Sequence, residues 1–167
     1  MALARSSPGW VPPPALAWWA LVLLPLAAVG AALVSQHVYG MEPCSWCVFQ
    51  RLVFLLIALA ALPGLFVRQP MVRRVLAAEA LLLAIGGTAS ALWMHFVAAK
   101  AESCKLTLAD RIVGGLGLDG LLPEVFAAYA SCADASVRLF GLRYELYALA
   151  LFLVLAAVAL QAMRRPA

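Results

Sequence analysis

The chain has 167 residues, of which 66% are hydrophobic and 12% are charged, and its mean hydropathy is +0.98. A soluble domain of this length cannot bury so much apolar surface in its own core, so the composition excludes an ordinary water-soluble fold. The formal net charge of +4 comes from scattered lysines and arginines. No basic cluster is interleaved with aromatic residues, so nothing indicates nucleic-acid binding.

Four apolar stretches are long enough to cross a bilayer as helices, for which about 20 residues suffice. The runs are continuous and rich in Leu and Ala, and they lack the polar–apolar alternation of membrane strands, which favours helices. The sequence therefore predicts an all-α membrane protein, a four-helix bundle formed by a single membrane domain over residues 1–167. The expected spans are residues 18–38, 46–67, 75–99 and 144–163, with a long loop over residues 100–143.

The first apolar stretch follows Arg5, as the core of a cleaved signal peptide would. However, it exceeds the usual signal core of about 7–15 residues, and it contains Pro25. We therefore expect this stretch to be a membrane helix of the mature protein.

The arginines indicate which side of the membrane each end and loop occupies, because positive residues beside membrane spans stay in the cytoplasm. They precede the first span, separate the second from the third, and follow the fourth, at Arg5, Arg68, Arg73, Arg74, Arg164 and Arg165. We therefore expect both chain ends to be cytoplasmic. The long loop, in which acidic and basic residues are interspersed, is expected on the opposite side.

All four cysteines fall on the non-cytoplasmic side of this predicted topology. Cys44 and Cys47 form a Cys-x-x-Cys pair where the second span starts, and Cys104 and Cys132 lie in the long loop. An even number of thiols outside the cytoplasm indicates disulfides. A zinc site is disfavoured because structural zinc sites usually pair two close-spaced Cys-x-x-Cys motifs, so we expect no metal.

The Cys-x-x-Cys pair is better suited to chemistry than to stapling the fold. A bridge between Cys44 and Cys47 would close a very short loop and remove little entropy from the unfolded chain. At a helix N-terminus, the free N–H groups and the helix dipole stabilise a thiolate. The pair is therefore predicted to be redox-active.

Two polar residues are predicted to lie inside the membrane near this pair. Arg51 lies four residues after Cys47, on the same helical face and about 6 Å deeper. An intramembrane arginine is a candidate functional residue, although its long side chain could instead reach the headgroups. His95 lies at a similar depth in the third span and is expected to join the site. His37, near the end of the first span, is expected to be structural.

Two further segments carry structural predictions. In the third span, Gly86 and Ser90, together with Gly87 and Ala91, are small residues one turn apart and predict close helix packing. Residues 121–130 of the long loop are expected to form a short amphipathic segment on the membrane surface.

In combination, these residues resemble the DsbB disulfide-bond formation proteins of the bacterial inner membrane. The resemblance covers nearly the whole chain and rests on four spans, the Cys-x-x-Cys pair followed by Arg51, and the two loop cysteines. It also includes Gln36-His37, Pro43, His95, Leu122-Pro123-Glu124-Val125-Phe126, Cys132-Ala133 and Leu139-Phe140-Gly141-Leu142.

The resemblance implies a quinone-dependent thiol–disulfide oxidoreductase that reoxidises a periplasmic DsbA-like oxidase of thioredoxin fold. It implies that the partner attacks a Cys104–Cys132 disulfide and that a Cys44–Cys47 disulfide then passes the electrons to ubiquinone or menaquinone. The quinone would lie against Cys47, Arg51 and His95. Two positions depart from the family pattern: Gln50 stands where some relatives carry an acid, and Tyr147 stands where a tryptophan is often found.

Two alternatives remain at this point. An enzyme of the vitamin K epoxide reductase type also combines four helices, two cysteine pairs and a quinone, but its Cys-x-x-Cys pair follows the loop pair in the chain. Here the Cys-x-x-Cys pair comes first. The second alternative is a membrane scaffold without catalytic activity, held together by structural disulfides.

Overall fold

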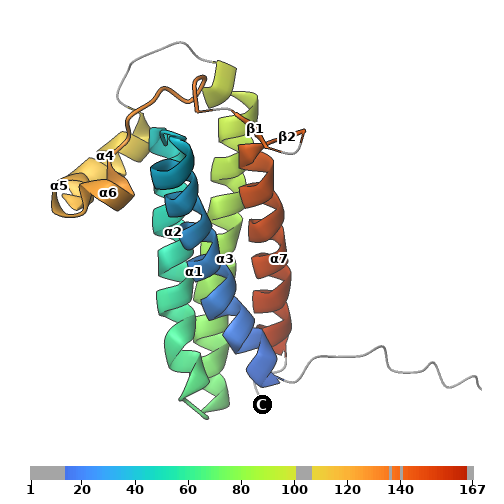
Figure 1. The fold of residues 1–167 in the computed structure, drawn as a ribbon. Coiled ribbons are helices and arrows are strands. Elements are labelled where there is room, and N and C mark those ends of the chain that lie inside the picture. Colours follow the sequence, from blue (N-terminus) through green and yellow to red (C-terminus); the bar gives the residue numbers. More distant parts are fainter. Residues whose placement is uncertain (1–13, 101–106, 136, 140, 165–167) are drawn as a thin grey trace, which may run out of the picture.

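The computed structural model describes residues 14–100, 107–135, 137–139 and 141–164. Its four long helices run side by side (Figure 1), and each is long and apolar enough to cross a membrane. They are α1 (Pro14–Tyr39), α2 (Ser45–Ala61), α3 (Pro70–Phe96) and α7 (Tyr144–Arg164). The predicted four-helix membrane bundle is thus confirmed. Cys104, Arg5 and Arg165 lie outside the described residues.

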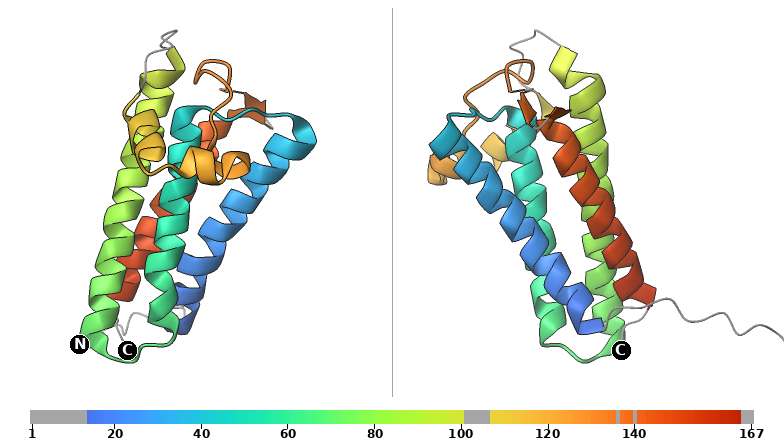
Figure 2. Two further views of the ribbon diagram at one scale, coloured as in Figure 1. Left: turned by 90° about the vertical axis from the view of Figure 1, so that its left-hand side faces the viewer. Right: turned by 45° about the vertical axis from the view of Figure 1, so that its right-hand side comes forward.

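The shorter elements between α3 and α7 lie at one end of the bundle (Figures 1 and 2). They are η2 (Ala98–Lys100), α4 (Leu108–Gly115), α5 (Leu118–Leu121), α6 (Pro123–Phe126), β1 (Arg138–Leu139) and β2 (Leu142–Arg143); η1 (Leu62–Leu65) extends α2 at the other end. Helices α4, α5 and α6 lie beside α2, and β1 and β2 lie at the start of α7. We call these two ends the loop end and the terminal end, because α1 starts and α7 finishes at the latter.

The loop contains one short helix within the segment predicted over residues 121–130, between the end of α5 at Leu121 and the extended backbone at Ala127. Its place on the membrane surface stays a prediction. In addition, β1 and β2 form a short antiparallel pair directly before α7, with Arg138 opposite Arg143. These elements position the start of α7 against the rest of the loop end.

Local sequence explains where several helices begin. Cys44 is the N-cap of α2, with extended backbone at φ −90° and ψ 169°. Thr107 and Asp110 form a reciprocal capping box at the start of α4. Pro70 starts α3 five residues before the predicted span, because Pro has no N–H that an initial helical turn would leave unpaired. The charged Arg73 and Arg74 therefore belong to the helix as well.

Beneath the loop end, the helices pack closely through glycine and aromatic rings. Phe54 of α2 stacks on Phe152 of α7, with ring centroids 4.1 Å apart. A Cβ atom on Gly87 of α3 would overlap the Phe152 ring, so only glycine fits there. The predicted close packing is therefore confirmed for Gly87, but it is wrong for Gly86, which faces open space.

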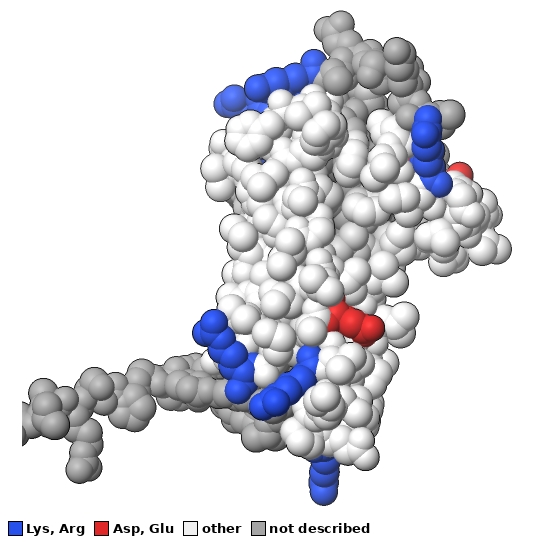
Figure 3. Space-filling model, turned by 180° about the vertical axis from the view of Figure 1, so that it is seen from behind, with Lys and Arg blue, Asp and Glu red and all other residues white. Residues whose placement is uncertain are grey.

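A second close contact lies at the terminal end. Trp18 is fully buried and fills the place that a side chain on Gly64 would occupy. The guanidinium carbon of Arg73 lies 5.3 Å from the centroid of the Trp18 ring, which is a cation–π contact. In Figure 3, the basic residues lie toward the two ends and the surface between them is almost uncharged, as lipid contact requires.

Candidate active site

The three described cysteines meet at the start of α2. Cys44 is fully buried, and its Sγ lies 3.2 Å from the Sγ of Cys47. The Cys44 thiol also hydrogen-bonds the Cys132 sulfur. All three are free thiols. Cys44 therefore contacts both the second cysteine of its own motif and a cysteine from the long loop.

Backbone hydrogen bonds bring Cys132 to this position. The N–H groups of Tyr129 and Ala130 donate to the carbonyl oxygen of Pro43, at 3.0 and 3.3 Å. Pro43 immediately precedes Cys44, and Ala130 lies two residues before Cys132. The loop is therefore fixed across the start of α2, where Cys132 packs beside Trp46 and Ala135.

These contacts change the acidity of the two thiols outside the membrane spans in opposite directions. The hydrogen bond from Cys44 lowers the pKa of Cys132 and outweighs burial, and the backbone N–H of Trp46 lowers it further. The same hydrogen bond, with the contact to Cys47 and burial, raises the pKa of Cys44. A free N–H at the start of α2 thus stabilises a thiolate on the loop cysteine.

Arg51 points into the protein. Only 6% of the residue is exposed, and its Nη1 donates to Gln36 Oε1 of α1 at 2.7 Å and to the carbonyl oxygen of Val125 in α6 at 3.0 Å. Gln36 in turn donates from Nε2 to the carbonyl oxygen of Glu124 at 3.2 Å. Arg51 and Gln36 therefore attach α6 to the bundle. The Arg51 side chain does not extend outward to the lipid headgroups, which was the alternative.

Cys47 and Arg51 line one cavity of about 320 Å³. Its walls are mostly apolar, with small residues of α1 on one side and Phe54 and Leu151 on others. The other polar side chains that line it are Ser35, Gln50, Tyr144, Tyr147 and Glu145. The shared helical face predicted for Cys47 and Arg51 is therefore the face that meets this cavity.

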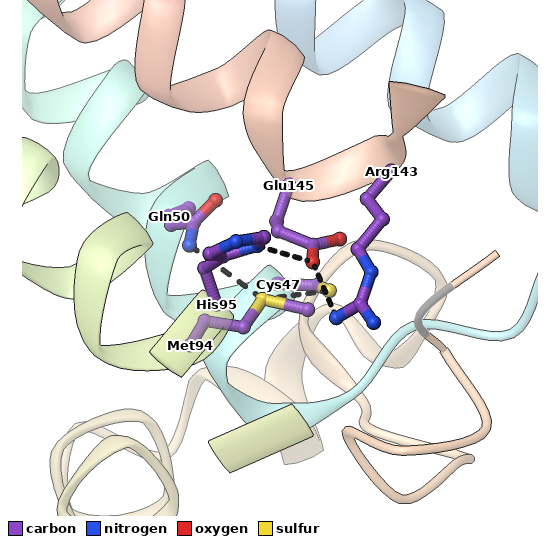
Figure 4. A network of polar contacts seen from close by, with 6 residues as sticks. All are labelled: Cys47, Gln50, Met94, His95, Arg143 and Glu145. Carbon is purple, nitrogen blue, oxygen red and sulfur yellow. Dashed lines mark hydrogen bonds and ion pairs between the residues drawn. The ribbon is translucent and has the colours of Figure 1, made fainter. Parts of the chain in front are cut away.

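His95 reaches the cavity only through a second residue. Its Nδ1 lies 3.1 Å from Glu145 Oε1, and Arg143 Nη1 lies 3.8 Å from the same oxygen (Figure 4). Glu145, in the first turn of α7, is 1% exposed and lines the cavity. His95 itself is not among the described residues that line the cavity, so the expectation that it contacts the site directly is wrong. Glu145 was missed from sequence, although a single acid in the first turn of a long apolar helix is a usable signal.

Met94 is a second residue that the sequence did not single out. Its sulfur lies 3.8 Å from both the Cys47 sulfur and Gln50 Nε2, so it packs between them on the cavity wall (Figure 4). Gln50 and Tyr147, the two departures from the family pattern, both line the same cavity. A methionine in an apolar helix gives no sequence signal, because most are ordinary core residues.

Comparison with known proteins agrees with this site. The sequence model of the family described as "Disulfide bond formation protein DsbB" matches residues 14–162. "Disulfide bond formation protein B 1" of Pseudomonas syringae pv. syringae is 36% identical over 141 residues, which cover 81% of each chain. The protein of the same name from Pseudomonas aeruginosa is 33% identical over 132 residues, or 76% of this chain and 80% of the relative.

A third relative extends the same pattern. "Disulfide bond formation protein B" of Herminiimonas arsenicoxydans is 32% identical over 139 residues, covering 83% of this chain and 87% of the relative. The match runs through all four membrane helices and the loop that carries Cys132. This chain therefore belongs to the DsbB family and is a multi-pass membrane protein of disulfide bond formation.

Proposed function

We propose that the chain is a quinone-dependent thiol–disulfide oxidoreductase of the bacterial inner membrane, which reoxidises a soluble DsbA-like oxidase. One observation supports this most strongly: Cys132 from the loop contacts Cys44, Cys44 contacts Cys47, and Cys47 lines an apolar cavity beside Arg51. The row of sulfurs thus runs from a loop that water can reach to a cavity inside the bundle. It can link a water-soluble electron donor to a lipid-soluble acceptor.

The proposed thiol chemistry begins with a Cys104–Cys132 disulfide. A thiolate of the partner attacks Cys104, so a mixed disulfide forms and Cys132 leaves as a thiolate. Cys132 then attacks Cys44, which breaks the Cys44–Cys47 bond and releases the Cys47 thiolate at the cavity. The backbone N–H of Trp46, which lowers the pKa of Cys132 whatever the redox state of Cys44, favours Cys132 both as leaving group and as attacking thiolate at neutral pH.

The second half of the exchange returns the loop to its starting state. The partner's second thiolate attacks the partner's own sulfur in the mixed disulfide, which releases oxidised partner and the Cys104 thiolate. Cys104 attacks Cys132, which breaks the Cys132–Cys44 bond, releases the Cys44 thiolate and forms the loop disulfide again. Cys44 and Cys47 remain as a dithiol that carries the two electrons.

The residues at the cavity fit a quinone. Its volume lies in the range of small-molecule sites, about 300–1,000 Å³, and its apolar walls suit a flat ring. Arg51 and Gln50 offer donors for a carbonyl oxygen. A bound quinone would supply a two-electron acceptor there. The Arg51 guanidinium would stabilise the Cys47 thiolate and negative charge on a neighbouring oxygen, because both lie in a site with little water.

The arginines support one orientation in the membrane. Near the terminal end, the described residues include Arg68, Arg73, Arg74 and Arg164. Positive residues beside short connections favour the cytoplasm, which supports a cytoplasmic terminal end and a periplasmic loop end. The described cysteines would then face the compartment in which disulfides form.

The test is anaerobic mixing of the purified protein in lipid with a reduced DsbA-like partner and either ubiquinone or menaquinone. We expect one quinol for each oxidised partner. The Cys47→Ser variant should form the mixed disulfide with the partner and produce no quinol. Full quinol production by this variant would refute the proposed electron route.

Thiol trapping without quinone separates the proposal from the scaffold alternative. If the partner's electrons enter the chain, maleimide labelling should show Cys44 and Cys47 becoming reduced after the partner is added. A structural bridge predicts that both cysteines stay oxidised.

A further inference from the structure

Glu145 is a buried titratable group that the thiol chemistry does not use. Its side chain is fully buried, and Oε1 lies near His95 Nδ1 and Arg143 Nη1. Within the described part of the chain, its Oε2 has no hydrogen-bond partner, and the residue lines the cavity that contains Cys47. A buried carboxyl oxygen without a partner costs free energy, so a function at this position is a reasonable expectation.

His95 connects this carboxyl group to the surface. Its side chain is 26% exposed, and it lies in the last turn of α3 at the loop end. One side of Glu145 thus faces an accessible imidazole and the other faces the cavity. Histidine is the side chain that most often carries protons near neutral pH.

The charged and titratable groups around Glu145 come from three helices and one strand. Helix α1 contributes only alanines and Ser35 to the cavity wall. The other groups are His95 of α3, Arg143 of β2, Cys47 and Arg51 of α2, and Tyr144 and Tyr147 of α7. His95 is the group within hydrogen-bonding distance of the carboxylate, at 3.1 Å, whereas the Arg143 nitrogen lies 3.8 Å away.

Resting on the proposed function, we propose that His95 and Glu145 form a proton relay from the surface of the loop end into the cavity. Oxidation of the Cys44–Cys47 dithiol releases two electrons and two protons, and reduction of a quinone to quinol consumes two of each. Cys47 enters this step as a thiolate, so one of the two protons was lost to water when the partner's thiol ionised, and the other comes from the Cys44 thiol. The proton lost to water is replaced from His95 Nδ1, which passes it to Glu145, and the carboxyl group passes it to an acceptor oxygen in the cavity. His95 then takes a proton from water, so the relay returns to its starting state.

The chain contains a matched control for this pair. Its only other histidine, His37, has its Nε2 3.5 Å from Oε2 of Glu124. That second pair is exposed, at 46% for His37 and 80% for Glu124, and neither residue lines the cavity among the described lining residues. A Glu124→Gln variant therefore removes a carboxylate that also pairs with a histidine but is not among the described residues that line the cavity.

The first experiment measures quinone-dependent turnover against pH. We expect Glu145→Gln to lower kcat on the order of 10²-fold, with the KM for quinone nearly unchanged, because only proton delivery is lost. Glu145→Asp, which keeps an acid, should recover part of the rate, and Glu124→Gln should match the parent protein. Reduction of Cys44 and Cys47 by the partner without quinone should be normal in all three variants.

The second experiment needs neither quinone nor turnover. Infrared spectra recorded at a pH low enough to protonate the Glu145 carboxyl group follow exchange of its proton after transfer into D₂O, and the Glu145 signal is identified by its loss in Glu145→Gln. We expect this exchange to be fast in the parent protein and slow in His95→Gln, because the path through the imidazole is removed. Equal exchange rates would refute the relay.

The pair should also act as one unit in turnover. Glu145→Gln combined with His95→Gln should be no slower than the more affected single variant. Multiplied losses, an effect on KM alone, or a Glu145→Gln variant with the parent pH profile would each refute the relay. A parent protein that makes no quinol would instead refute the proposed function.

Discussion

Two regions of the bundle, a closely packed one and a cavity, serve different purposes. We call Trp18, Gly64, Gly87 and Phe152 the packed core, because ring and glycine contacts there leave no space for added atoms. Toward the loop end, helices α1, α2, α3 and α7 enclose a cavity lined by Cys47, Arg51 and Glu145. Phe54 connects the two regions, since it stacks on Phe152 of the packed core and lines the cavity.

This contrast shows where stability and chemistry are placed. Between membrane helices, association depends on close van der Waals packing, because lipid tails are as apolar as the side chains. Buried polar groups destabilise unless they have partners, and they are retained where they serve a function. Changes in the packed core should therefore alter stability, whereas changes at the cavity should alter turnover.

The largest expected effect is on stability. Trp18→Ala removes a fully buried ring and its cation–π contact with Arg73. We expect a loss of about 3 kcal/mol in the free energy of unfolding, the low end for a buried tryptophan because lipid tails compete for apolar surface. Unfolding in mixed detergent micelles measures it. Turnover per folded molecule should be unchanged, and a strong loss of specific activity would contradict the division between the two regions.

Replacing Arg51, at the cavity, should alter turnover and not stability. Arg51→Ala should slow quinone-dependent turnover by about 10²-fold, as expected for the loss of a charge that stabilises a developing anion. Attack by the partner on the loop disulfide should stay nearly normal in stopped-flow measurements. Arg51→Lys should restore part of the rate, and Arg111→Ala, at an exposed position of α4, is the control. Unchanged quinone kinetics in Arg51→Ala would reject the assigned role.

Two adjacent glycines sharpen the comparison within the packed core. Gly87→Ala places a methyl group into the Phe152 ring and should destabilise the protein by about 1–3 kcal/mol. Gly86→Ala faces open space and should be neutral or stabilise by up to about 1 kcal/mol, because alanine favours the helix. Thermal unfolding of both variants in detergent tests this difference, and equal effects would contradict it.

The smallest expected effect is on the labelling rates of the thiols at the loop end. Because the pKa of Cys132 is held below its ordinary value of 9.0, its thiolate persists to lower pH than that of an ordinary thiol. In the reduced protein at pH 7, iodoacetamide should therefore label Cys132 faster than Cys44, whose pKa is raised. Cys44→Ala removes the hydrogen bond, raises the pKa of Cys132 and should slow its labelling. Peptide mass spectrometry measures both rates, and faster labelling of Cys44 would contradict the assignment.

The sequence alone determined the membrane spans and the part of the site carried by α2. Hydrophobic length specifies a membrane helix locally, and the helical repeat puts Cys47 and Arg51 on one face whatever surrounds them. It also indicated that Gly87 lies in a close helix contact. These features depend on residues near one another in the chain, so a pattern of residue types is enough to find them.

The tertiary structure decided which distant residues complete the site. Cys132 reaches Cys44 because backbone groups of residues 129 and 130 bind the Pro43 carbonyl, and a backbone hydrogen bond leaves no pattern in residue types. His95 meets Glu145 fifty positions away, and Gln36 reaches α6 across 88 positions. Such pairs form only when the helices are rotated correctly about their axes and the loop is docked. Both depend on packing and polar contacts throughout the bundle, and not on residues near one another in the chain.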